Sequence, residues 1–379
     1  MRREKLIERK EKAESKIREK SKKIIILIFT FFISLLSFGC RQQEELVWEP
    51  GVPFPREKLT IGIIHPNEIE SASIFDYAHY VGTLEMQQRA GLGDHQIIRK
   101  TNVFDRDPAA VEGAMRDSIA EGANVIIAAS WGYMDVCERL AEEFPNVIFL
   151  HSMGYKFNDR NFTNYAIRLY HARYLAGIVA GLATQTNMIG FVAAWGKDNS
   201  QVTSGINAFA IGVESVNPDA RVYVRITHSW FDPMGETNAA NALIAAGCDV
   251  ITTHVNTSSA QIAAQRAGVL AIGYNYDMSA DAPDAVITSV VPYWGPLYTR
   301  LIEDIIDGTF NPQPHFYGLA EGVINITPLN SALAPQGVET VLHMARQRIL
   351  NEGFNVFDDL SDDVILSSMD WYNHNVMEF

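Results

Sequence analysis

The sequence predicts an α/β protein with two lobes, each a parallel sheet flanked by helices. Short apolar runs of strand length alternate with helical patterns from residue 59 onward, and the alternation continues as two successive series. Hydrophobic residues make up 47% and charged residues 20% of the 379 residues, a composition typical of a packed globular protein. This length accommodates two domains of ordinary size and a short additional segment.

The first series contains helix-start and helix-stop signals with a known mechanism. Asp107 is suited to cap a helix that has Pro108 at its first position, and Gly122 is suited to end it. This series is expected to contain strands at 59–64, 96–101, 125–129 and 147–150, and helices at 75–89, 108–121 and 134–143.

The second series repeats the same order of patterns. It is expected to contain helices at 172–184, 202–216, 236–246, 258–267 and 297–307, and strands at 188–193, 221–226, 250–253, 270–273 and 285–290. Ligands of open parallel sheets bind just beyond the carboxyl ends of the strands. The loops that follow these strands are therefore the expected location of a site.

The N-terminus has the parts of a secretory signal peptide. Residues 1–23 include 11 basic and 5 acidic residues, and residues 24–38 are an apolar stretch shorter than the roughly 20 residues of a spanning helix. Cys40 follows a glycine in a pattern that resembles a bacterial lipobox, which implies cleavage before the cysteine and its acylation. Residues 1–39 are therefore expected to be a lipoprotein signal peptide and 40–58 a tether, and an uncleaved membrane anchor is the alternative.

The rest of the chain is acidic, with 20 basic and 40 acidic residues. This balance argues against a nucleic-acid partner, because phosphate contacts need clustered Lys and Arg. Cys137 and Cys248 lie in apolar patterns and are expected to be buried thiols. The sequence has no phosphate-binding loop, dinucleotide-binding glycine motif, His-Glu-x-x-His or nucleophile turn. The absence of these motifs removes the commonest enzyme classes, and a hydrolase acting on nucleosides stays conceivable. We predict no catalytic residue, no metal and no cofactor, in a protein that is not an enzyme.

Four of the six tryptophans each follow an expected strand: Trp131, Trp195, Trp230 and Trp294. Large rings in exposed loops are costly unless something stacks on them. They are expected to line a cleft and hold a flat ligand by stacking, which combines dispersion with burial. Packing between lobes or under a loop is the alternative for each of them.

Three polar residues near the strand ends are suited to contact the edge of such a ligand: Asp135, Asn256 and Asp277. The alternative for Asp135 is a first-turn carboxylate stabilised by the helix dipole, and for Asn256 it is a helix N-cap. Asp277 has no evident helix to cap, which favours a functional role. Packing or solvation is expected to account for all ten histidines.

In their order and spacing, segments from roughly residue 58 to 330 resemble the basic membrane protein family of substrate-binding lipoproteins, which includes the purine nucleoside receptors of spirochaetes. The resemblance rests on Phe75 with Gly82, and on segments 130–135, 144–147, 205–212, 216–219, 230–233, 273–278 and 294–296. It implies a two-lobed periplasmic-binding-protein-like fold of type I. It also implies an ABC importer permease as partner, and a lipid-anchored location at the cell membrane, on the periplasmic or surface face.

The resemblance further implies roles for three residues. Phe75 would stack on a purine, Asp135 would bond its edge, and Asp277 would contact the sugar side of a nucleoside. The expected function is a solute-binding lipoprotein of an ABC importer that binds a purine base or nucleoside between its lobes by aromatic stacking. The alternatives are a nucleoside hydrolase-like enzyme on the same scaffold, and a surface antigen or adhesin without a small ligand.

Three positions depart from the family pattern. Asp76 replaces an Asn, and Gly205 replaces a second stacking Phe, so that Trp195 or Trp131 would supply that face. Pro292 stands where many members have a ribose-binding Lys. The loss of that lysine favours a bare base such as adenine over a nucleoside.

The two lobes are expected to be joined by strands that cross the hinge near Asn164, Thr253 and Val291. The first lobe is expected to comprise residues 59–164 and about 254–291, and the second lobe 165–253 and about 292–379.

Overall fold

Two sheets organise the residues from Trp48 to Phe379, which form one compact unit in the computed structural model. The structure describes residues 18, 48–69, 73–351, 353–358 and 360–379. Apart from residue 18, the expected signal peptide lies outside the described residues, as do Cys40 and the first part of the expected tether. Within the described ranges, no helix has the length and apolar character needed to cross a membrane.

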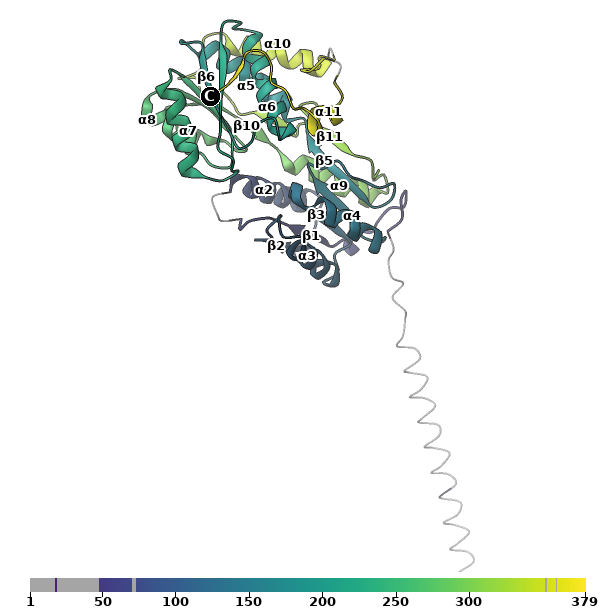
Figure 1. Ribbon diagram of the computed structural model, residues 1–379. Helices are drawn as coiled ribbons and strands as arrows, with labels where there is room; N and C mark the ends of the chain where they lie inside the picture. Colours follow the sequence, from purple (N-terminus) through teal and green to yellow (C-terminus); the bar gives the residue numbers. More distant parts are fainter. Residues whose placement is uncertain (1–17, 19–47, 70–72, 352, 359) are drawn as a thin grey trace, which may run out of the picture. The chain divides into compact units, whose positions relative to one another are not determined.

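The first sheet is parallel throughout and has the strand order β11-β5-β4-β3-β1-β2. Its strands are β1 (Ile61–Ile64), β2 (Ile97–Lys100), β3 (Val125–Ala128), β4 (Ile148–Ser152), β5 (Phe162–Ile167) and β11 (His315–Tyr317). The helices of this lobe are α2 (Ile74–Arg89), α3 (Pro108–Ala120), α4 (Met134–Glu143) and α9 (Trp294–Asp307) (Figure 1).

The second sheet has the order β12-β10-β9-β8-β6-β7-β13 and is parallel except at β10–β12. Its strands are β6 (Met188–Ala193), β7 (Arg221–Ile226), β8 (Val250–His254), β9 (Leu270–Tyr274), β10 (Val286–Pro292), β12 (Ile324–Ile326) and β13 (Val376–Glu378). The helices of this lobe are α5 (Leu169–Ala183), α6 (Ser200–Glu214), α7 (Pro233–Ala245), α8 (Ser259–Ala267), α10 (Val338–Asn351) and α11 (Asp362–Ser367).

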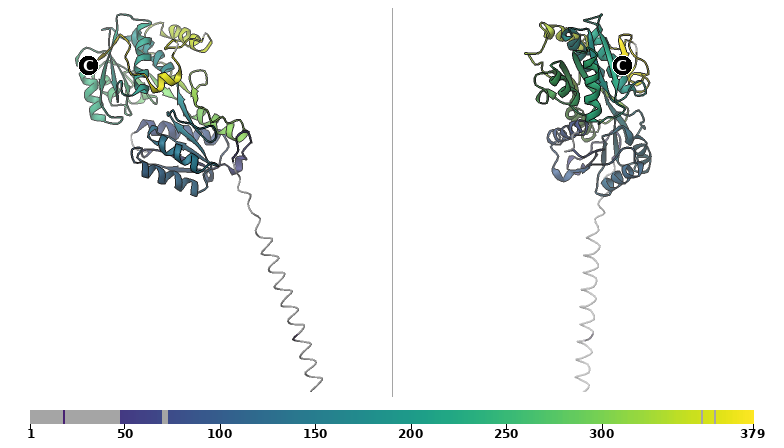
Figure 2. Two further views of the ribbon diagram at one scale, coloured as in Figure 1. Left: turned by 45° about the vertical axis from the view of Figure 1, so that its right-hand side comes forward. Right: turned by 60° about the vertical axis from the view of Figure 1, so that its left-hand side comes forward.

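The lobe boundaries differ from those expected. Strands β9 and β10 belong to the second sheet, so residues 254–291 are part of the second lobe. Helix α9 packs on α2 and β5, so 294–307 belong to the first lobe, and the light-green α9 lies among the blue elements in Figure 2. The strand–helix pattern reads the same in both lobes, and it carries no information about which sheet a strand joins.

The chain passes between the lobes three times. It crosses between β5 and α5, between β10 and α9, and between β11 and β12. The crossings expected near Asn164 and Val291 agree with the first two, since β5 and β10 contain these residues. The crossing expected near Thr253 is wrong, because β8 leads through α8 back into the same sheet.

Local signals in the sequence agree closely with the structure. Asp107 caps α3, where its Oδ1 accepts the backbone N–H of Ala109 at 3.1 Å and of Ala110 at 3.2 Å. Gly122 follows that helix with a φ of +104°. The two cysteines of the described ranges, Cys137 and Cys248, are buried and unpaired, as predicted.

The expected tether at 40–58 is wrong from Trp48 onward. The Trp48 side chain is only 2% exposed, and its ring lies edge-on to Phe310 with centroids 5.9 Å apart. Phe54 is buried as well, and its backbone N–H donates to the carbonyl of Ile306 at 3.1 Å. From Trp48 onward this segment has no α-helix or strand, only a 3-10 turn at Arg56–Lys58, but the apolar side chains of Trp48 and Phe54 still pack on the first lobe.

Candidate functional site

A cleft of about 730 Å³ is lined by residues of both lobes, within the size range of small-molecule sites. Most of the lining comes from the loops that follow β1, β2, β3, β6, β7, β8 and β9, together with the first turns of α2, α6 and α9. Met153 after β4 and Leu366 of α11 also line the cleft. The carboxyl ends of both sheets therefore contribute to one cavity, where the strand-end rule places a ligand.

Six of the eight ligand-binding residues expected from the sequence line this cleft: Phe75, Trp131, Trp195, Trp230, Asn256 and Trp294. Phe75 and Trp131 come from the first lobe, in the first turn of α2 and in the short 3-10 helix after β3. Trp195 and Trp230 come from the second lobe, after β6 and β7. The structure thus brings rings from the two lobes to the same cavity.

The tryptophans differ in how much of the ring is accessible. Trp131 is 56% exposed, whereas Trp294 is 5% exposed. The Trp294 ring stacks on His79 with centroids 4.0 Å apart and planes at 24°. Among the described residues, its Nε1 has no hydrogen-bond partner. Trp294 is therefore mainly a packing residue in the cleft wall, and Trp131 leaves more of its side chain accessible.

Asp135 and Asp277 are not brought to the cleft. Asp135 is 80% exposed in the first turn of α4, where it forms an ion pair with Lys156 Nζ at 2.9 Å. Asp277 caps a 3-10 turn, and its Oδ1 accepts the N–H of Ser279 at 3.0 Å. Asp135 thus agrees with its alternative, a carboxylate in the first turn of a helix. Asp277 caps a 3-10 helix of three residues, which is too short to predict from the sequence.

Asn256 does not cap a helix, unlike the alternative considered for it. Its backbone N–H donates to the carbonyl of Trp230 at 2.8 Å. Its Oδ1 accepts from Nδ2 of Asn275 at 3.3 Å, and both side chains line the cleft. These bonds join the loops after β7, β8 and β9 into one polar wall.

Several polar residues of the cleft were missed in the sequence: Asn67, Asp105, Gln201, His228, His254 and Asn275. Four of them, Asn67, His228, His254 and Asn275, follow expected strands whose end loops are the expected location of a site. The expectation that packing or solvation explains every histidine does not cover His228 and His254. The available signal was their position, just after β7 for His228 and at the end of β8 for His254.

Backbone strain concentrates at the cleft. Of the six non-glycine residues with positive φ in the described ranges, four line it: Asn102, Met153, His228 and Asn275, with φ between 55° and 67°. Each lies in the loop after a strand. A side chain in this region costs on the order of 1 kcal/mol or more, and such residues cluster at functional sites.

Asp76, one of the departures from the family pattern, lies beneath the cleft wall. It is 1% exposed, and its Oδ2 accepts from Nδ2 of Asn67 at 2.8 Å and from Oγ of Ser73 at 2.7 Å. Burial raises the pKa of Asp76 despite these bonds. Asn67 and Ser73 line the cleft, so Asp76 bonds two lining residues from beneath and is not itself part of the lining.

The other two departures are Gly205, which lies against the cleft-lining His254, and Pro292. A Cβ added at Gly205 would lie 3.2 Å from Nδ1 of His254, so the imidazole occupies the space beside this glycine. His254 Nε2 lies 3.0 Å from the Tyr274 hydroxyl, and the guanidinium of Arg173 lies 4.3 Å from the centre of the Tyr274 ring. Burial lowers the pKa of Arg173 to about 10, which leaves it charged behind this wall. Pro292 lines the cleft directly.

Buried histidines around the cleft are held in the neutral form. Burial, and then the charge of Arg99, lowers the pKa of His65 to about 4, although Asp76 Oδ1 lies 3.9 Å from its Nδ1. Burial also lowers the pKa of His151 to about 4, against the bond of its Nε2 to the Ser130 carbonyl at 2.9 Å. Desolvation therefore outweighs the local partners at both positions.

We expect stability to fall as the pH drops from about 6.5 towards 4. The unfolded chain protonates His151 near its ordinary pKa of 6.5, whereas the folded protein does so only near 4, so stability present above this window is lost within it. A His151→Gln variant keeps a donor for the Ser130 carbonyl but does not titrate. Urea unfolding at several pH values measures the free energy of unfolding, which should depend less steeply on pH in this variant than in the wild type. Equal slopes would contradict the lowered pKa of His151.

Comparison with known proteins identifies relatives of this architecture. Residues 58–357 match a family described as ABC transporter substrate-binding protein, PnrA-like. A purine-binding protein of Brucella abortus is 33% identical over 308 residues, which cover 81% of this chain and 85% of that protein. A Haloferax volcanii protein, named as an ABC transporter glucose-binding protein, is 34% identical over 67% of this chain and 65% of its own length.

The fold agrees with that of solved transport proteins. An ABC transporter solute-binding protein of Conexibacter woesei superposes with a TM-score of 0.64 at 20% identity, covering 78% of this chain and 98% of that one. The predicted two-lobed α/β fold of the periplasmic-binding-protein type is thereby confirmed.

Proposed function

The chain belongs to the PnrA-like family of ABC transporter substrate-binding proteins, and on this premise we propose that it binds a purine base or nucleoside between its lobes for delivery to an importer. The identity with the Brucella purine-binding protein supports this ligand class. A substrate-binding protein of an ABC importer binds a small molecule and a permease, and this family is not one of enzymes.

The observation that carries the proposal is the convergence of rings from both lobes on one cleft. Phe75, Phe104 and Trp131 line it from the first lobe, and Trp195, Trp230 and Phe231 line it from the second. Phe104, Trp131 and Phe231 are each about half exposed. A planar ligand between such rings buries its own faces and theirs, which stabilises the closed arrangement of the lobes.

The edge of a heterocycle needs hydrogen-bond partners, and the cleft offers them on both sides. Asn67, Ser130 and Asp105 lie on the first-lobe side, where Ser130 Oγ donates to Asp105 Oδ2 at 2.7 Å. Asn256 and Asn275 lie on the second-lobe side. Amide groups both donate and accept, so they suit the alternating donors and acceptors on the edge of a purine.

A sugar is the second candidate ligand, favoured by the identity with the Haloferax protein. The test is a thermal-unfolding panel with adenine, adenosine, guanosine, glucose and, as control, cytosine. A ligand that binds only the folded state raises the unfolding midpoint. At a ligand concentration of a hundred times Kd, it adds about 2.7 kcal/mol to the free energy of unfolding. We expect purines to raise the midpoint and glucose and cytosine to leave it unchanged. A shift with glucose alone would replace the purine proposal.

The same samples address the hydrolase and adhesin alternatives. Adenosine incubated with the protein should be recovered intact in stoichiometric amount, whereas accumulating free base would show catalysis. A flat response to the whole panel would favour a surface protein without a small ligand.

We further propose that acylation of Cys40 ties the exported protein to the membrane, which would keep the cleft near the permease.

A further inference from the structure

The last residues of the chain lie beyond the family match, which ends at residue 357. We call residues 358–379 the C-terminal strap; it contains α11 and β13. Strand β13 adds to the edge of the second sheet, where Val376 pairs with Val222 and Glu378 with Val224. The Phe379 backbone N–H also donates to the carbonyl of Val224 at 2.8 Å. The end of the strap is thus fixed to the second lobe.

The start of the strap is fixed at a lobe crossing. Arg168, directly after β5, donates through Nε at 3.1 Å to both carboxylate oxygens of Asp362, and through its Nη2 at 2.8 Å to Oδ2. The Tyr170 hydroxyl donates to Oδ1 of Asp362 at 2.6 Å. A bidentate pair of this kind fixes geometry as well as adding stability. Helix α11 therefore starts from a defined point beside the hinge.

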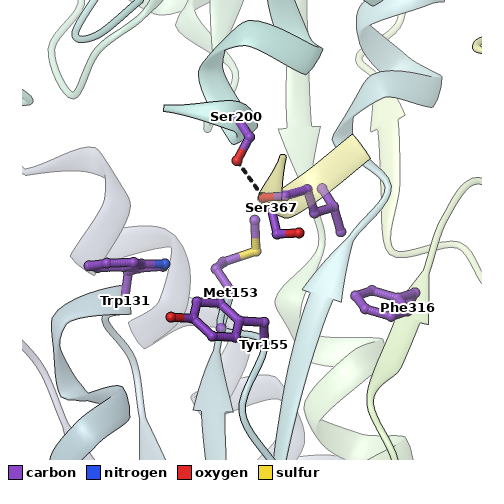
Figure 3. A pocket seen from close by; sticks show the side chains of 8 residues that line it. Trp131, Met153, Tyr155, Ser200, Phe316 and Ser367 are labelled. Atoms are coloured by element: carbon purple, nitrogen blue, oxygen red, sulfur yellow. Dashed lines mark hydrogen bonds between the residues drawn. The ribbon is translucent and has the colours of Figure 1, made fainter. Parts of the chain in front are cut away.

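From this anchor, α11 reaches the ligand cleft. Leu366 lines the main cleft, and its carbonyl accepts from the Ser200 hydroxyl at 2.7 Å. Leu366 also lines a smaller cavity of about 80 Å³. Figure 3 shows this cavity, with Trp131 and Tyr155 of the first lobe across from Ser200 and the strap.

The smaller cavity continues the cleft past the ring of Trp131, which lines both spaces together with Met153. The lobes are already linked on this flank, because Gln201 Nε2 of the second lobe donates to the carbonyl of Met153 in the first at 2.8 Å. The volume left between Trp131 and the strap takes only a few water-sized groups. The space at this end is therefore small beside the main cleft of about 730 Å³.

We infer that Leu366 is a specificity-determining residue, with which the strap limits ligand length next to Trp131 and favours a free purine base over its nucleoside. This inference rests on the proposed function. The Ser200 bond fixes the backbone of Leu366, and the Asp362 anchor fixes the start of its helix. Its side chain therefore acts as a wall, and a shorter side chain at this position lengthens the cleft.

The test is calorimetric titration of adenine and adenosine into the full-length protein and three strap variants. We expect Leu366→Ala to lower the ratio of adenosine Kd to adenine Kd by roughly tenfold, the scale on which a pocket distinguishes small apolar groups. Val364→Ala changes the same helix at a residue that lines neither cavity and should leave the ratio within about twofold. Leu366→Met keeps the side-chain volume and should keep the ratio near that of the wild type.

Thermal unfolding of each variant shows whether α11 remains folded. A folded Leu366→Ala protein with an unchanged ratio overturns the role of Leu366 while leaving purine binding intact. A wild-type protein that binds neither adenine nor adenosine overturns the proposed function, and the inference with it.

Discussion

Phe75→Ala should weaken purine binding by about 1–3 kcal/mol, or roughly 5- to 150-fold in Kd, the scale of a lost stacking face. Phe75 lines the cleft from the first turn of α2, and its ring lies edge-on to His79 with centroids 4.4 Å apart. His79 in turn stacks on Trp294. The Phe75 ring is therefore held by a column of rings before any ligand arrives, so little side-chain entropy is lost on binding.

Trp131→Ala should have an effect of similar size, about 1–3 kcal/mol, because its ring is the most exposed of the four strand-end tryptophans. Isothermal titration calorimetry with adenine measures both variants. Phe157→Ala and Trp371→Ala are matched controls, since both rings are about half exposed and neither lines the cleft. Unchanged affinity in both Phe75→Ala and Trp131→Ala, with all four variants folded, would remove the two rings from the ligand site.

The sequence predicted the tryptophans at the cleft better than the carboxylates. A large ring in a loop after a buried strand needs other groups to cover it. The positions of the tryptophans after β3, β6 and β7 therefore indicate a cleft at these strand ends. A carboxylate after a strand has many partners available. Asp135 takes Lys156, which lies 21 residues along the chain from it, and Asp277 takes a backbone N–H two residues on. Sequence patterns do not distinguish either bond from a ligand contact.

Lys156 reaches Asp135 from the loop after β4, and a pair between a loop and a helix of this kind depends on tertiary structure. The same holds for the lobe boundaries. Elements from 59 to 143 were located within a few residues, because hydrophobic period and caps are local. Membership of a sheet is set by pairing between distant strands, as for β10 with β9 and β12. The short strands β11, β12 and β13 have only three residues each, too few to show a period.

The spacing of α5 and α6 gives the largest expected effect on stability. Gly177 of α5 and Gly212 of α6 lie at the crossing of these helices, where no side chain fits. A Cβ at Gly177 would lie 2.0 Å from the carbonyl oxygen of Phe209, and one at Gly212 would lie 2.1 Å from that of Tyr174. Both obstacles are backbone atoms, so a rotamer change cannot relieve the clash and the helices must move apart.

Gly177→Ala should therefore lower the free energy of unfolding by about 3 kcal/mol, the upper part of the range for overpacking, despite the higher helix propensity of alanine. Urea unfolding measures this change. Gly113→Ala is the matched control, because this exposed glycine of α3 has nothing within 4 Å of an added Cβ and should gain about 0.5–1 kcal/mol. Because α6 also carries Gln201 and Ser204 to the cleft, separation of the helices should weaken ligand binding in Gly177→Ala but not in Gly113→Ala. A Gly177→Ala protein as stable as the wild type would mean that the two helices are not in close contact at this crossing.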